Sequence, residues 1–133
     1  MMLKKLLLGL LFLTMAVMSG QSAHAADANA VKAQLMTARE NLVAMLDVGD
    51  KTPAATRIAA IGEATKSVDA AIEGAAEYAA FKEVWAAFKT TRDGELIPLI
   101  TSGKIAEAKA LSASVQSERM KKMVGILAEL GAK

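Results

Sequence analysis

Two arginines in this sequence are placed where a guanidinium group could meet an anion. The first, Arg92, lies four residues after Phe88, on the same helical stripe as the aromatic residues before it. A charge on an apolar face must be paired, reach water or meet an anion. The position of Arg92 therefore leaves two interpretations open: a structural salt bridge or helix-end contact, or a place in an anion-binding site.

Arg39 supplies the second cation for the binding interpretation. Arg92 lies nine residues before Thr101, the expected end of the third helix, and Arg39 lies nine before Val48, the expected end of the first. The first and third helices of an up-down bundle are parallel, so both arginines are expected at one level.

The last predicted helix would bring hydroxyl and amide groups to that level, from Ser112, Ser114 or Gln116. Two guanidinium groups together with such polar side chains suit a carboxylate. The sequence thus predicts a ligand site formed by Arg39, Arg92, Ser112 and Gln116 for a small organic acid or amino acid.

Other chemistries lack the residues that they require. The chain has no cysteine, and its one histidine is His24. Nucleophilic catalysis, c-type and b-type haem ligation, and the Glu-x-x-His pairs of bundle di-metal sites all need one or both residue types. We therefore expect no catalytic residue, no cofactor and no metal site, and we expect the protein not to be an enzyme. The methionines are expected to fill core space, and Asp69 and Glu73 to lie on a solvated surface.

Residues 1–25 have the pattern of a secretory signal peptide that is cleaved before Ala26. Lys4 and Lys5 precede an apolar run over 6–18, and Ala23-His24-Ala25 gives a small-x-small cleavage site. The run is shorter than the about 20 residues of a membrane-spanning helix, and without cysteine it cannot carry a lipoprotein anchor. We expect residues 26–133 to reach the periplasm of a Gram-negative bacterium as one domain, with no stable membrane insertion after cleavage.

The remaining chain has no net charge. The formal charge of the full sequence is +2, and the leader contains two lysines and no acidic residue. A neutral domain gives no reason to expect nucleic acid as a partner.

Helical periodicity covers the rest of the sequence. Apolar residues recur at steps of three and four over 27–48, 53–73, 76–101 and 104–130, and no segment alternates with period two. Gly49, Thr52 and Pro53 suit a helix end followed by a new start, and Pro98 predicts a kink in the third helix. Short breaks between helices of similar length predict an all-α, antiparallel up-down-up-down four-helix bundle.

The third and fourth segments carry a recognisable pattern. Tyr78, Phe81, Trp85 and Phe88 are followed by Thr91-Arg92-Asp93, by Leu96 to Ile100, by Ser102-Gly103-Lys104 and by Ala106-Glu107-Ala108. This pattern resembles the periplasmic four-helix-bundle sensor domain of methyl-accepting chemotaxis receptors. The resemblance covers about residues 76–130, and residues 27–73 share only the periodicity.

The resemblance implies a periplasmic sensor that binds a small, anionic ligand and pairs through its helices. Receptors of this family continue into a second membrane span and a signalling region, whereas this sequence ends at Lys133. We therefore expect a stand-alone sensory bundle that presents its ligand to a membrane receptor. The alternative is a non-catalytic structural or interaction protein of the cell envelope, as a homodimer.

Overall fold

The computed structural model describes residues 28–133, which are helical with no strand in that range. The predicted all-α class is therefore confirmed, whereas the predicted leader lies outside the described residues. The first two predicted helices correspond to α2 (Ala28–Met45) and α3 (Ala54–Ile72). The third is built from η1 (Ala76–Tyr78), α4 (Ala79–Thr91), η2 (Arg92–Leu96) and α5 (Ile97–Thr101), and the fourth from α6 (Ile105–Leu111), η3 (Ser112–Gln116) and α7 (Ser117–Glu129).

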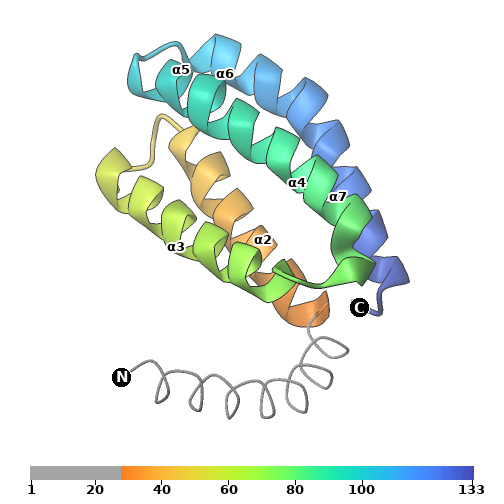
Figure 1. Ribbon diagram of the computed structural model, residues 1–133. Coiled ribbons are helices and arrows are strands. Elements are labelled where there is room, and N and C mark those ends of the chain that lie inside the picture. Colours follow the sequence, from red (N-terminus) through yellow and green to blue (C-terminus); the bar gives the residue numbers. More distant parts are fainter. Residues whose placement is uncertain (1–27) are drawn as a thin grey trace, which may run out of the picture.

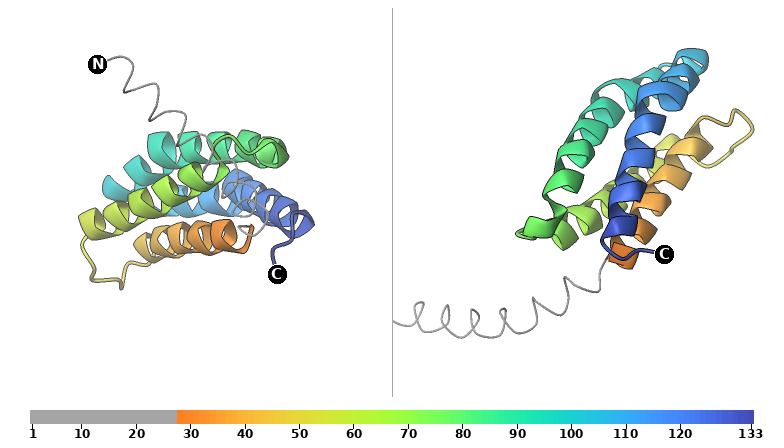
Figure 2. Two further views of the ribbon diagram at one scale, coloured as in Figure 1. Left: turned by 60° about the horizontal axis from the view of Figure 1, so that its bottom comes forward. Right: turned by 90° about the vertical axis from the view of Figure 1, so that its right-hand side faces the viewer.

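The helices are arranged as two pairs. α2 lies beside α3, and α4 lies beside α7 (Figure 1). Further views show the same pairing, and α2 also contacts α7 (Figure 2). The end of the chain returns to the start of α2, where the Lys133 amide donates to Asn29 Oδ1 at 2.8 Å and Lys32 Nζ donates to the Lys133 carbonyl at 2.8 Å.

Glycine closes two of the connections. Gly103 follows α5 with φ of 83°, a conformation that costs residues with a Cβ atom. The Lys104 amide donates to the Leu99 carbonyl at 2.8 Å and the Gly103 amide to the Ile100 carbonyl at 3.0 Å, which is a Schellman motif. Gly74, with φ of 73°, makes the corner after α3, at the break that the sequence predicts.

The connection between α2 and α3 differs from the sequence expectation. Gly49 does not adopt positive φ, Pro53 precedes the helix, and no side chain of the described residues caps α3. The connection is instead held by Arg57, whose Nη2 lies 3.0 Å from Asp50 Oδ1 and whose Nη1 donates to Asn41 Oδ1 at 3.0 Å. The hydrogen bonds and positive charge of Arg57 hold the pKa of Asp50 below its usual range.

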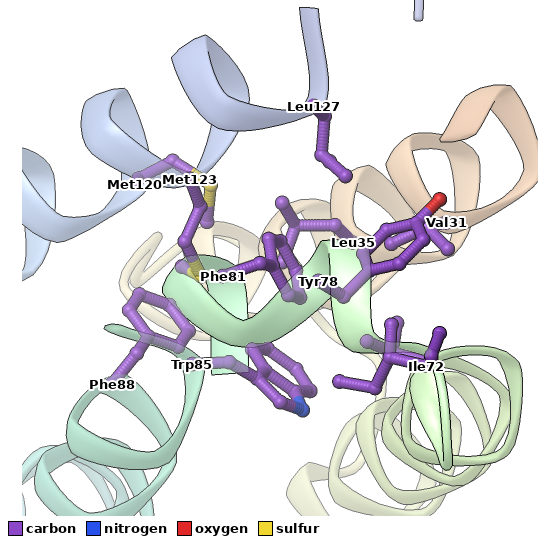
Figure 3. Packing of buried hydrophobic residues seen from close by; sticks show 12 residues of the cluster. Val31, Leu35, Ile72, Tyr78, Phe81, Trp85, Phe88, Met120, Met123 and Leu127 are labelled. Carbon is purple, nitrogen blue, oxygen red and sulfur yellow. The ribbon is translucent and has the colours of Figure 1, made fainter. Parts of the chain in front are cut away.

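The core divides into two apolar clusters. The larger is built around the predicted aromatic stripe, and Figure 3 shows Tyr78 and Phe81 between side chains of α2 and of α7. The second joins the later part of α2 to the early part of α3 and to α5 and α6, with Leu42 and Leu96 among its members. Burial of these side chains is the main stabilising term of the fold.

The third helix passes Pro98 through a π-helical segment. η2 directly precedes α5, in which Pro98 occupies the second position. A proline inside an α-helix collides with the carbonyl group four residues earlier and leaves it without a donor. The wider π-helical turn relieves this crowding, so the helix continues to Thr101. The sequence predicts only a kink at this place.

The interior position of Val68 can be tested against an exposed valine. Val68 is 0% exposed, whereas Val48 in the α2–α3 connection is 84% exposed. Because Val68→Ala removes two buried methyl groups and leaves a cavity, it should lower the free energy of unfolding by about 2 kcal/mol. The same change at Val48 should alter it by less than about 0.5 kcal/mol. Urea denaturation followed by circular dichroism measures both, and equal effects would contradict the packing described.

The Asp50–Arg57 pair should make stability depend on acid pH. A carboxyl group with a lowered pKa in the folded state stabilises fully above its unfolded value, here 3.8, and that contribution is lost as pH falls below it. The stability difference between the wild type and Asp50→Asn should therefore be largest near neutral pH and shrink below pH 3.8. Urea denaturation from pH 7 to pH 3 measures it, and a constant difference would refute the pairing.

Candidate functional site

A cavity of about 710 Å³ opens between α2 and the last helical run. Five residues line it from the side of α2 and the turn that follows: Met36, Arg39, Leu42, Val43 and Leu46. The opposite wall follows one face of α6, η3 and α7. The volume of this cavity lies in the range of small-molecule sites, about 300–1,000 Å³.

Three of the four predicted ligand-binding residues line this cavity: Arg39, Ser112 and Gln116. They reach it from α2 and from η3, which are distant in the sequence. The prediction that the last helix brings Ser112 and Gln116 toward Arg39 therefore agrees with the cavity geometry.

Arg92 is not among the lining residues of the cavity. Its side chain is 3% exposed, and its Nε donates to Asp93 Oδ1 at 2.9 Å while Nη2 donates to Oδ2 at 3.3 Å. The guanidinium carbon also lies 5.8 Å from the centre of the Trp85 ring. The sequence left a salt bridge and an anion-binding site open as interpretations for Arg92. In the structure Arg92 forms a salt bridge, and the face of an aromatic ring lies nearby.

One nitrogen of Arg92 remains without a protein partner. Nη1 is buried and has no hydrogen bond to any atom of residues 28–133. Buried donors that lack a partner are costly, and the ring of Trp85 supplies part of the compensation.

Arg39 differs from the other described arginines in its lack of a hydrogen-bonding partner among residues 28–133. Arg57, Arg92 and Arg119 each donate hydrogen bonds to oxygen atoms of nearby groups. Arg39 is exposed and has no hydrogen bond or ion pair within the part of the chain that the structure describes. Its planar guanidinium fork is available for a carboxylate at the cavity mouth.

Two lysines add positive charge to the same cavity. Lys109 comes from α6 and Lys121 from α7, and both are exposed at its rim. No aspartate or glutamate is among the described residues that line the cavity. Lys121 is 3.7 Å from Glu118, an exposed pair that contributes little and leaves the lysine accessible. The rim therefore carries three cations over apolar walls.

Gln116 forms the polar part of the cavity floor. It is buried, and its Nε2 donates to the Phe88 carbonyl at 3.1 Å. Its Oε1 accepts from Arg119 Nη1 at 3.0 Å, and the same nitrogen donates to Thr91 Oγ1 at 2.7 Å. Gln116 has two N–H donors, so one remains available after the bond to Phe88.

Two π-helical segments flank this network. η2 begins directly after Thr91, and η3 supplies Ser112 and Gln116 to the cavity. Such wide turns are rare and occur frequently at functional sites. In η3 the Ser114 hydroxyl donates to the Ala110 carbonyl at 2.8 Å, a side-chain bond that competes with the regular backbone ladder.

One residue of the aromatic stripe connects the cavity with the core. Phe88 lines the cavity, and its ring stacks on Trp85 with centres 6.0 Å apart and an interplanar angle of 14°. The indole N–H of Trp85 donates to Asp69 Oδ1 at 2.7 Å, and Lys89 pairs with the same oxygen at 2.9 Å. Asp69, predicted as a plain surface residue, thus ties α3 to α4.

Sequence reasoning missed several residues of this site, above all the apolar lining and the two lysines. A signal was present, because positions 109, 112, 116, 120 and 124 follow one helical face and carry Lys, Ser, Gln, Met and Val. Such a face mixes polar and apolar residues, although the helix is otherwise expected to be buried there. A mixed face of this kind indicates that solvent reaches it.

Comparison with known proteins found no match to any family model, curated protein or solved structure. Within residues 28–133, no group of three or more His, Cys, Asp or Glu could hold a metal ion. Over the same range, no helix has the length and apolar character needed to cross a membrane.

The Gln116 network predicts a stability cost when its amide is replaced. Gln116→Met keeps the length of the side chain but leaves the Phe88 carbonyl and Arg119 each with one hydrogen bond fewer. It should lower the free energy of unfolding by about 1–3 kcal/mol. Gln34→Met on α2, where the amide has no hydrogen bond to residues 28–133, is the matched control and should be nearly neutral. Urea denaturation of both variants decides, and equal values would contradict a structural role for Gln116.

Proposed function

We propose that this protein is a non-catalytic, exported, sensor-like protein that binds a small organic anion in the cavity between α2 and the last helical run. The supporting observation is the charge of that cavity. Arg39, Lys109 and Lys121 line it, and no acidic residue accompanies them among the described lining residues. Such a site favours a carboxylate over a neutral or cationic ligand.

The proposed fold is an antiparallel, up-down-up-down four-helix bundle related to receptor sensor domains. Support comes from the short connections and from the contact of the chain end with the start of α2 through Asn29. The aromatic residues of the third helix and the Gly103 turn are the features that resemble receptor sensor domains.

Export to the periplasm is proposed from the leader-like residues 1–25. A binding protein in that compartment can present its ligand to a membrane receptor. A pairing of two copies, as in receptor bundles, fits this role.

Recognition would combine a charged head group with apolar contact. The guanidinium of Arg39 can hold a carboxylate through two parallel hydrogen bonds. Ser112, Ser117 and the second N–H of Gln116 are further donors along the same cavity. Aliphatic side chains of α2 and α7 would cover the rest of the ligand and displace water.

An organic acid should therefore raise the melting temperature. A ligand that binds only the folded state stabilises by about 2.7 kcal/mol at 100 times its Kd. In a domain of this size that is a rise in Tm of roughly 10 °C or more. Differential scanning fluorimetry with a panel of amino acids and organic acids of increasing size measures it.

Variants that remove a charge test whether the rise in Tm comes from binding in the cavity. Arg39→Gln should remove most of the shift while the protein still folds, because Arg39 has no structural partner in the described region. Lys66→Gln on α3, also an exposed cation, should leave the shift intact. The proposal fails if no acid raises Tm. A stable dimer that closes the cavity would then favour the interaction protein of the cell envelope.

A further inference from the structure

We propose that the ligand is a straight-chain aliphatic carboxylate, a fatty acid, whose head group binds Arg39 and whose chain lies along the apolar wall. The inference rests on the proposed function, because it names the class of anion for the same cavity. It depends on three features: the extent of the apolar lining, the position of the free cation and the open space beside Gly125.

The apolar lining extends further than a short acid would cover. On the wall that faces Arg39 the lining runs from Gln116 to Gly125, which is about 14 Å at 1.5 Å per residue. A short dicarboxylate or an amino acid would cover a small part of this surface and leave the rest against water. An alkyl chain of ten or more carbons has a length of the same order, and each added methylene would remove more apolar surface from water.

The lining is aliphatic and adaptable. Met36 and Met120 lie on opposite walls, and methionine adjusts its shape to irregular, flexible ligands. Phe88 is the one aromatic side chain among the described lining residues, and one face of its ring is already stacked on Trp85. These surfaces favour an alkyl chain over a rigid ring.

The head group is placed by the unpaired guanidinium. Arg39 is the arginine that has no partner in the described part of the chain, and it can bind both oxygens of a carboxylate. Lys121 lies on the facing helix and can add a second, weaker attraction because it is only loosely paired with Glu118.

Gly125 marks open space at one end of the lining. A Cβ atom added there would meet no described atom within 4 Å beyond its chain neighbours and the backbone of its own helix, and the residue lines the cavity. Because Gly125 lines the cavity and its surroundings are open, we expect a larger side chain there to take up part of the space for the alkyl chain without disturbing the core. Gly62 on α3 has equally open surroundings but lies away from the cavity, so it provides a matched control.

Binding of saturated fatty acids to the purified protein tests the proposal. Octanoate, decanoate and dodecanoate are titrated below their micelle concentrations, by calorimetry and by the fluorescence of Trp85. The Kd should fall by up to about fourfold per added methylene, the factor that corresponds to burial of one CH₂ group. Dodecyltrimethylammonium, which has the same chain and a cationic head, should not bind.

Two pairs of variants locate the ligand. Arg39→Gln should weaken dodecanoate at least tenfold, whereas Lys66→Gln should not. Gly125→Leu should weaken dodecanoate much more than octanoate, and Gly62→Leu should leave both unchanged. Circular dichroism and Tm verify that each variant folds.

The outcomes separate this inference from the proposed function. If short acids bind with Arg39 dependence and dodecanoate binds no more tightly than octanoate, the fatty acid is wrong and the anion site stands. If the cationic detergent binds equally well, or Gly125→Leu and Gly62→Leu behave alike, the chain does not occupy this cavity and the inference is overturned. If no carboxylate of any length binds, both proposals fall.

Discussion

The stripe of aromatic side chains on the third helical run holds this structure together. Tyr78, Phe81, Trp85 and Phe88 are all buried, and each ring contacts the next along the stripe. Large rings spaced one helical turn apart fill the space between helices that otherwise carry many alanines, so α2, α3 and α7 pack against a common surface. The last ring of the stripe, Phe88, belongs to the core on one side and to the cavity on the other.

A polar layer follows directly after the aromatic stripe and separates the two apolar clusters. Arg92 and Thr91 lie in it from the third helical run, and Gln116 and Arg119 from the fourth. Buried polar groups must find partners, and here most of them find each other or a backbone carbonyl. The two π-helical segments lie next to this layer and change which side chains face inward. Of the residues in this layer, Gln116 also lines the cavity, opposite the side chains of α2.

The candidate site shows how far residue spacing can reach. Positions counted from expected helix ends placed Arg39 at the level of Ser112 and Gln116, and all three line one cavity. The same count placed Arg92 beside them, yet a guanidinium group can also form its ion pair with a residue of its own helix. Its adjacent Asp93 offers two oxygen atoms, and pairing with them directs the side chain toward Trp85. Residue spacing gives the level of a residue along a helix. The position of the charged end of a long side chain depends on its hydrogen-bonding and ion-pair partners.

The sequence by itself determined the all-helical class, the four helical runs and the aromatic core, because apolar periodicity and glycine turns act locally. It also predicted, from residue counts along the expected helices, that Arg39, Ser112 and Gln116 lie near one level of the bundle. Only the tertiary structure decided that a cavity exists, since its walls come from helices at opposite ends of the chain. The hydrogen bond from Gln116 to the Phe88 carbonyl belongs to the same category, because it joins residues that are 28 positions apart. Local preference sets which elements form, whereas the space between them follows from how all of their side chains pack at once.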